Sequence, residues 1–324
     1  MSTIKRIGVL TSGGDAPGMN AAVRAVVRTA IKNNIEVFAI YSGYKGMISG
    51  DIKQLKTTDV SGIIQNGGTI IKTARSKEFH TPEGRKKAYD NLNKHNIDAV
   101  IVIGGDGTFT GASIMIKEFD IPFVGIPGTI DNDIFGTDYT IGYDTCLNTV
   151  MQAVDKIRDT ANSHDRVFFI EVMGKEAGFV ALNSSIACGA EGAFIPEVES
   201  QLCQIIDFLK KNKDKRNSSI FLVAEGDEEG HAIEIADKVK QECPELDVRV
   251  TILGHIQRGG SPSCVDRINA SRLGAAAVQA LIDGKKDIMV GLQSDKIVFV
   301  PLAQTVKTHK SISSELVKLS ELLV

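Results

Sequence analysis

Two aspartates, Asp131 and Asp133, are the side chains in this sequence best placed to do chemistry. They follow the apolar run Ile121–Ile126, which predicts a short buried strand that ends in a turn. Open α/β sheets bind their ligands at the carboxyl ends of strands. There, one carboxylate can take a proton from a hydroxyl, while the second orients the first or helps to hold a metal. Aspartates also form ordinary turns by capping backbone groups, so this segment alone leaves both interpretations open.

Two glycine-rich turns are candidate phosphate sites. In Thr11-Ser-Gly-Gly-Asp-Ala-Pro-Gly-Met-Asn20, paired glycines let the backbone approach a phosphate, and the helix expected after them favours an anion. This turn lacks the spacings of the dinucleotide fingerprint and of the Walker loop, and tight turns also use glycine. In Ile103-Gly-Gly-Asp-Gly-Thr108, three glycines around Asp106 predict a phosphate cradle in which the carboxylate reaches a phosphate-bound Mg²⁺. The alternative for Asp106 is a helix N-cap, which does not require three glycines.

A third motif combines a histidine and an arginine with glycines. It reads Gly254-His-Ile-Gln-Arg-Gly-Gly-Ser-Pro262 and is preceded by Arg249. The guanidinium of Arg258 can grip a dianionic phosphate through two parallel hydrogen bonds, with His255 beside it. A lone His–Arg pair is more often structural, but the flanking glycines favour an anion pocket.

Buried strands and amphipathic helices are expected to position these motifs. Apolar runs that predict strands lie at Ile7–Thr11, Val37–Tyr41, Ala99–Ile103, Ile121–Ile126, Val167–Val172, Ser219–Ala224 and Arg249–Leu253. Helical periodicity fills the intervals, for example at Asn20–Lys32, Thr145–Thr160 and Asp266–Ile282. This alternation predicts an α/β fold with parallel sheets covered on both faces, and a domain boundary near Gly142.

Composition limits the classes of function. With 324 residues, the chain is longer than one hydrophobic core usually supports. Its net charge of −3 does not favour nucleic acid as a partner, and no apolar run approaches the roughly 20 residues of a membrane span. The five cysteines and six histidines show no metal-ligand spacing, and no signal-peptide core precedes the first strand, so we expect a cytoplasmic protein without a zinc site. The basic run Lys210–Arg216 predicts a solvated helix end.

Taken together, the motifs resemble the phosphofructokinase family, in particular its bacterial ATP-dependent members. The resemblance holds in order and spacing from residue 5 to about residue 300. It rests on the segments 13–20, 104–108, 127–133, Glu171-Val-Met-Gly174 and 254–262. It implies phosphorylation of fructose 6-phosphate at its 1-hydroxyl to give fructose 1,6-bisphosphate, the committed step of glycolysis. ATP would be the co-substrate and Mg²⁺ the cofactor.

The resemblance also implies roles for individual residues. Asp131 would be the base, supported by Asp133, with Thr129, Arg75 and Lys175 completing the catalytic set. Bacterial relatives usually carry arginine where this chain has Lys175, which keeps the charge but loses the bidentate fork. ATP would be bound by Gly14, Arg75, Ser76, Gly105, Asp106, Gly107 and Thr108, with Asp106 holding the metal. Fructose 6-phosphate would be bound by Thr129, Ile130, Asp131, Arg166, Met173, Gly174, Lys175, Glu225, Arg249, His255, Ile256, Gln257 and Arg258.

The expected fold consists of two Rossmann-like three-layer α/β domains with mostly parallel sheets, between which the chain crosses. By resemblance, the ATP-binding domain comprises residues 1–141 and 255–306, and the fructose 6-phosphate domain comprises residues 142–254 and 307–324. In this family Arg166 and Arg249 reach a neighbouring subunit's substrate, so a homotetramer with shared active sites is expected.

The sequence gives weaker signals for the phosphoryl donor and for the allosteric effectors. Pyrophosphate-using relatives carry bulkier residues where this chain has Gly107 and Gly128, which favours ATP. ADP or phosphoenolpyruvate is expected at an effector site formed by Arg24, Arg28, Arg158 and Glu191, although Arg24 and Arg28 also fit a solvated basic face. The alternatives are a pyrophosphate-dependent enzyme, a non-catalytic nucleotide-sensing paralogue, and another sugar-phosphate or NAD kinase with the same glycine loop.

Overall fold

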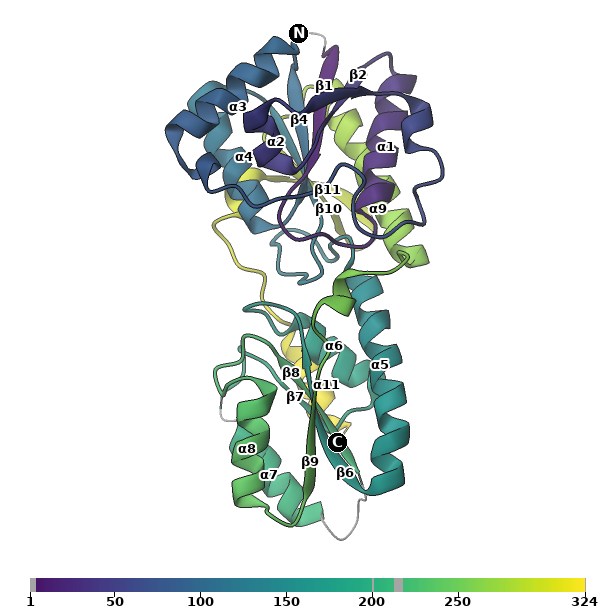
Figure 1. Ribbon diagram of the computed structural model, residues 1–324, viewed down its shortest axis with the longest axis vertical. Coiled ribbons are helices and arrows are strands. Elements are labelled where there is room, and N and C mark those ends of the chain that lie inside the picture. The colour runs from purple at the N-terminus through teal and green to yellow at the C-terminus, as the bar shows by residue number, and fades with distance from the viewer. Residues whose placement is uncertain (1–3, 200, 213–217, 324) are drawn as a thin grey trace. The chain divides into compact units, whose positions relative to one another are not determined.

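The computed structural model describes residues 4–199, 201–212 and 218–323. The chain forms two compact units, each built from segments that are distant in the sequence (Figure 1). Unit 1 comprises Met1–Thr129, Ile134–Thr145 and Arg258–Lys310, and unit 2 comprises Ile130–Asp133, Cys146–Gln257 and Ser311–Val324. Each of the three later crossings falls a few residues beyond the expected position, and the short excursion Ile130–Asp133 was not expected.

The sheet of unit 1 has seven strands in the order β11-β10-β5-β4-β1-β2-β3. Its five inner strands are parallel, and the two edge strands β3 and β11 are antiparallel to their neighbours. The strands are β1 (Arg6–Thr11), β2 (Glu36–Ile40), β3 (Ile52–Leu55), β4 (Ala99–Gly104), β5 (Phe123–Pro127), β10 (Ile288–Gln293) and β11 (Lys296–Pro301).

Helices cover both faces of this sheet. On one face α1 (Met19–Lys32) packs along α9 (Cys264–Ile282), and on the other lie α2 (Gly43–Ser49), α3 (Pro82–Lys94) and α4 (Asp106–Phe119) (Figure 1). A Cβ atom on Gly274 would lie 2.7 Å from the carbonyl oxygen of Ala22, so glycine is what lets α9 approach α1 closely. The shorter elements are η1 (Thr57–Val60), η2 (Glu78–His80) and α10 (Leu302–Thr305).

Unit 2 contains a four-stranded, wholly parallel sheet in the order β7-β8-β6-β9. Its strands are β6 (Arg166–Val172), β7 (Gly192–Phe194), β8 (Ser219–Ala224) and β9 (Asp247–Ile252). Helices α7 (Gln201–Asn212) and α8 (Ala232–Glu242) pack on one face, opposite α5 (Tyr143–His164) and α6 (Phe179–Cys188) (Figure 1). The unit is completed by η3 (Gly254–Arg258), whose last residue belongs to unit 1, and by α11 (Ser314–Leu322), which packs on α6. The predicted α/β fold with two mostly parallel sheets is confirmed.

A buried carboxylate explains why the first long crossing comes later than expected. Asp266, in the first turn of α9, accepts hydrogen bonds from the backbone N–H groups of Gly142 and Thr145, each at 2.8 Å. These bonds hold the beginning of α5 in unit 1. Burial raises the pKa of Asp266, and the hydrogen bonds from Thr145 and Gly142 oppose that shift.

Two further expectations concern the surface of the chain. Lys210 and Lys211 lie in the last turn of α7, as predicted, whereas residues 213–216 of the basic run lie outside the described residues. Among the helices that the structure describes, none combines the length and apolar character needed to cross a membrane.

Candidate active site

The first glycine turn of unit 1 follows β1 and is shaped by an arginine. Gly13 has a φ of 84°, which favours glycine. A Cβ atom on Gly14 would lie 2.4 Å from Nη1 of Arg258, and the same Nη1 donates to the carbonyl oxygen of Asp15 at 3.2 Å. The sequence assigned Gly14 to the nucleotide and Arg258 to the sugar phosphate, and the structure places the two side by side in unit 1.

The second glycine turn joins β4 to α4 and is tied to the first. A Cβ atom on Gly104 would lie 2.4 Å from Oγ1 of Thr108 and 2.5 Å from the carbonyl oxygen of Ser12. The Thr108 hydroxyl donates to that carbonyl at 3.1 Å and is buried. At Gly107, no described atom lies within 4 Å of the Cβ position. The turn therefore offers open space at the N-terminus of α4, where the helix dipole favours an anion.

Asp106 is the first residue of α4 and is half-buried. Mg²⁺ in nucleotide sites is usually held by one or two carboxylates together with substrate phosphates. Among the described residues, no three His, Cys, Asp or Glu side chains group into a metal site. A carboxylate in the first turn of α4, next to the open space at Gly107, fits an ion that arrives with a nucleotide.

The segment that carries Arg75 and Ser76 is fastened to the first glycine turn. The Thr73 hydroxyl donates to the carbonyl oxygen of Gly13 at 2.7 Å, and the Thr11 hydroxyl donates to the carbonyl of Lys72 at 2.9 Å. Arg75 is exposed, whereas Ser76 accepts a hydrogen bond from the N–H of Phe79 at 3.3 Å. Of the predicted nucleotide residues, Gly14 follows β1, the segment 105–108 follows β4, and Arg75 and Ser76 lie on a segment that Thr73 ties to the first glycine turn.

The aspartate loop leaves β5, which neighbours β4 in the sheet. Thr129 stands beside the cradle, because its Cβ lies 3.6 Å from the Cβ position of Gly105. The Thr129 carbonyl accepts a hydrogen bond from the Thr140 hydroxyl at 2.6 Å. Asp131 is only 7% exposed and Ile130 is fully buried, whereas Asp133 is half-buried. The role of Asp131 as a base stays a prediction.

In unit 2, a strained turn follows β6. Gly174 has a φ of 152° and Lys175 a φ of 59°, an uncommon value for a lysine. Glu225, which follows β8, accepts the N–H of Lys175 at 2.8 Å. The fully buried side chain of Gln257 accepts the N–H of Met173 at 3.1 Å. The sequence predicted sugar contacts for Glu225 and Gln257, and the structure shows that both also hold the 173–175 turn in shape.

Two residues that were predicted to bind the sugar phosphate, Arg166 and Arg249, lie on β6 and β9, away from this turn. Arg166 begins β6 and contacts Asp247, the first residue of β9, at 2.7 Å. Arg249 contacts the same carboxylate at 3.0 Å. The hydrogen bond from Arg166 is the main reason that the pKa of Asp247 is lowered. Met173 follows the far end of β6, roughly 20 Å away at about 3.3 Å per residue. His255 and Ile256, in η3 after β9, are exposed.

The predicted effector residues are divided between the units. Arg24 is half-buried and Arg28 is exposed on α1. In unit 2, Nη2 of Arg158 donates to the carbonyl oxygens of Cys188 and Gly189 at the end of α6, at 2.8 and 2.9 Å. Glu191 accepts the N–H of Ile220 at 2.6 Å. Binding of ADP or phosphoenolpyruvate at these residues stays a prediction.

The sequence and the structure of this chain are similar to those of known proteins. The family model described as phosphofructokinase matches residues 6–281. The chain belongs to the phosphofructokinase family. The resemblance inferred from the glycine turns and the aspartate loop is thereby confirmed.

Individual relatives of this phosphofructokinase match along almost its whole length. An ATP-dependent 6-phosphofructokinase 2 of Bacteroides thetaiotaomicron is 58% identical over 318 residues, which cover 98% of both chains. An ATP-dependent 6-phosphofructokinase of Cytophaga hutchinsonii is 52% identical over 99% of this chain and 98% of its own. Among solved structures, phosphofructokinase from Saccharomyces cerevisiae is similar with a TM-score of 0.87 and 39% identity, covering 94% of this chain and 45% of the yeast chain.

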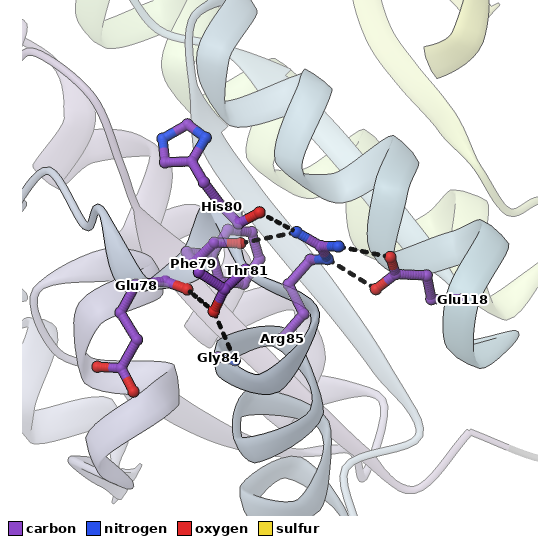
Figure 2. A network of polar contacts seen from close by, with 7 residues as sticks. All are labelled: Glu78, Phe79, His80, Thr81, Gly84, Arg85 and Glu118. Atoms are coloured by element: carbon purple, nitrogen blue, oxygen red, sulfur yellow. Dashed lines mark hydrogen bonds and ion pairs between the residues drawn. The ribbon is translucent and has the colours of Figure 1, made fainter.

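An ion pair between a buried arginine and a partly exposed glutamate in unit 1 of this phosphofructokinase was not predicted from the sequence. Arg85 on α3 and Glu118 on α4 pair at 2.6 Å, and Figure 2 shows the guanidinium reaching back to the turn at Glu78–His80. The run Arg85-Lys86-Lys87 has the pattern of a solvated basic surface. Nothing in the local sequence distinguishes the buried arginine from the two exposed lysines beside it.

Proposed function

We propose that this phosphofructokinase transfers the terminal phosphoryl group of ATP to the 1-hydroxyl of fructose 6-phosphate, which yields fructose 1,6-bisphosphate and ADP. The observation that carries the proposal is the 58% identity, over 98% of both chains, to a protein named ATP-dependent 6-phosphofructokinase 2. The open glycine cradle of unit 1 and the shielded Asp131 support it with groups suited to a donor phosphate and to an acceptor hydroxyl.

In the proposed reaction, the carboxylate of Asp131 takes the proton of the 1-hydroxyl as the oxygen attacks the terminal phosphorus of ATP. The bond from that phosphorus to the bridging oxygen breaks, and ADP leaves with the electron pair. Asp133 supports Asp131 from the same loop. Arg75, Thr129 and Lys175 supply positive charge and hydrogen bonds to the transferred group, which suits a loose phosphoryl-transfer transition state.

Asp106, at the start of α4, is the residue that would hold a magnesium ion. A magnesium ion held there would neutralise the charge that develops on the nucleotide phosphates. The backbone of Gly105–Thr108 orients the nucleotide independently, because its N–H groups lie at the N-terminus of the helix.

The choice of ATP over pyrophosphate has a structural argument in two glycines. Open space at Gly107 leaves room for the nucleotide beyond its terminal phosphates. At Gly128, a Cβ atom would lie 3.1 Å from Cγ2 of Ile103 and 3.3 Å from Cε of Met19, so a larger residue must displace one of them. Neither position therefore carries the bulk typical of pyrophosphate-dependent relatives.

The test is a coupled assay of the purified protein with fructose 6-phosphate and either ATP or pyrophosphate. We expect turnover with Mg-ATP and none with pyrophosphate. A Gly107→Asp variant should fold normally, since no described atom obstructs the new side chain, and should lose at least about tenfold in kcat/KM for ATP. Turnover with pyrophosphate alone would establish the pyrophosphate-dependent alternative, and no turnover with either donor would establish the non-catalytic one.

We further propose that Arg166 and Arg249 act in the active site of a neighbouring subunit of a homotetramer. Arg166 begins β6 and Arg249, the third residue of β9, shares its ion-pair partner Asp247, whereas Met173 and Glu225 follow the carboxyl ends of β6 and β8, so Arg166 and Met173 lie beyond opposite ends of one strand. A closed symmetric assembly can bring the amino ends of the strands in one subunit close to the carboxyl ends of the strands in another.

Mixed assemblies test this arrangement. Asp131→Asn and Arg166→Ala should each be nearly inactive as pure proteins. After co-expression in equal amounts, about one site in four should combine an intact Asp131 with a neighbour's intact Arg166, and activity should recover to about a quarter of the wild-type value. If Arg166 served the site of its own chain, every mixed site would lack one group and no activity would return.

A further inference from the structure

We propose that the ion pair between the buried Arg85 and the partly exposed Glu118 is a positioning clamp that sets the place of Arg75 and Ser76 beside the phosphate cradle. The inference rests on the proposed use of ATP, because the roles of Arg75 and Ser76 are part of that proposal. It adds two residues to the machinery of the reaction, neither of which would touch a substrate.

The first observation is the geometry of the pair. Nε and Nη2 of Arg85 donate to the two carboxylate oxygens of Glu118 at 2.7 and 2.6 Å, in a bidentate arrangement that fixes the plane of the guanidinium (Figure 2). The Arg85 side chain is 8% exposed and that of Glu118 is 31% exposed. The hydrogen bond from Arg85 lowers the pKa of Glu118, so the pair is charged on both sides near neutral pH.

The remaining guanidinium nitrogen of Arg85 points to the turn formed by η2. Nη1 of Arg85 donates to the carbonyl oxygens of Phe79 and His80 at 3.1 and 2.8 Å, which are the last two residues of η2 (Figure 2). Thr81 caps α3 by accepting the N–H of Gly84 at 3.1 Å, and its hydroxyl donates to the carbonyl of Glu78 at 2.8 Å. The whole turn is thereby fixed to α3 and α4.

The third observation links this turn to both sides of the nucleotide site. Toward the N-terminus, the N–H of Phe79 binds the Ser76 hydroxyl at 3.3 Å. Toward the cradle, the Phe79 ring stacks on Tyr44 at 3.9 Å between centroids. The Tyr44 hydroxyl in turn donates to the carbonyl oxygen of Thr108 at 2.5 Å. A shift of the turn would therefore move Ser76 and Thr108 together.

A purely structural pair would stabilise unit 1 without affecting how ATP binds. A positioning clamp must in addition change the use of ATP selectively and act through Arg75. Kinetic constants for the two substrates separate these cases, because misplacing a group by about 1 Å in a phosphoryl-transfer site costs up to about a hundredfold in rate.

The experiment compares Glu118→Gln, Arg85→Lys and a control, Lys87→Met. The control removes the exposed ion pair between Lys87 and Glu78 of the same turn, which spans 2.8 Å, and leaves the clamp intact. We expect Glu118→Gln and Arg85→Lys to raise KM for ATP about fivefold to twentyfold with KM for fructose 6-phosphate within about twofold, as loss of one charged hydrogen bond implies. Lys87→Met should change neither constant.

Two further measurements make the outcome decisive. In an Arg75→Ala background, Glu118→Gln should add little to the loss in kcat/KM for ATP, since residues that act through one another are not additive. Hydrogen exchange of the segment 72–81 without nucleotide should be faster in Glu118→Gln than in Lys87→Met. An unchanged KM for ATP with a lowered midpoint of thermal unfolding would overturn the clamp. Should the wild-type protein fail to use ATP, the proposed function falls, and unchanged exchange of 72–81 would then overturn the clamp on its own.

Discussion

An Asp131→Asn variant is expected to lose about 10²- to 10⁴-fold in kcat while KM for fructose 6-phosphate changes little, because the amide cannot accept the proton of the 1-hydroxyl. Asparagine has the size of aspartate, and Asp131 is 7% exposed, so the replacement removes a buried charge without opening a cavity. Initial rates in the coupled assay measure kcat and KM, and a thermal melt checks that the variant is folded.

Two comparisons make this result specific. Asp133→Asn should lower kcat less than Asp131→Asn, since Asp133 is half-buried and would support the base without taking the proton. The rise of kcat with pH that reports the ionisation of the base should be present in the wild-type protein and absent in Asp131→Asn. Full turnover by Asp131→Asn would remove Asp131 from the role of base.

Asp106→Asn is expected to produce the second large effect, a loss of about 10²- to 10³-fold in kcat/KM for Mg-ATP. Asparagine still fits the first turn of α4, but it offers Mg²⁺ a neutral oxygen in place of a charged one. The concentration of Mg²⁺ that gives half-maximal rate should rise along with the loss. Titrating Mg²⁺ at saturating fructose 6-phosphate measures both.

The same helix supplies the control for Asp106→Asn. Asp120, the residue that ends α4, has a carboxylate that is 96% exposed. Asp120→Asn removes the same charge from the opposite end of the helix and should leave the kinetics and the Mg²⁺ requirement unchanged. Equal losses in Asp106→Asn and Asp120→Asn would mean that net charge, and not the position of Asp106, controls nucleotide use.

How much of the fold was predictable depends on burial. The strands β4 and β8 are buried at every residue, so a continuous apolar run located them to within one residue. β3 and β7 were missed because β3 is buried only at its two end residues, Ile52 and Leu55, and β7 has three residues. β10 was missed although it is mostly buried, because Gly291 interrupts its apolar run; a Cβ atom there would lie 2.8 Å from the carbonyl oxygen of Gly136.

For the candidate site, predictability depended on whether a feature involves the main chain or contacts between distant side chains. The glycine-rich turns were recognisable in the sequence, because close approach of other atoms to the main chain restricts the residue type directly. The contacts among side chains were not recognisable. Neither the packing of Arg258 against Gly14 nor the clamp formed by Arg85 with Glu118 leaves a local pattern, since the partners lie far apart in the sequence.

The strand order of unit 1 has a consequence for the growing chain on the ribosome. β5 pairs on one side with β4, which precedes it closely, and on the other with β10, which is synthesised only after nearly all of unit 2. Until then the apolar edge of β5 has no partner strand and can pair with other chains. Unit 2 has most of its sequence before unit 1 can close, so the N-terminal strands of this protein wait for residues 288–301 before their sheet is complete.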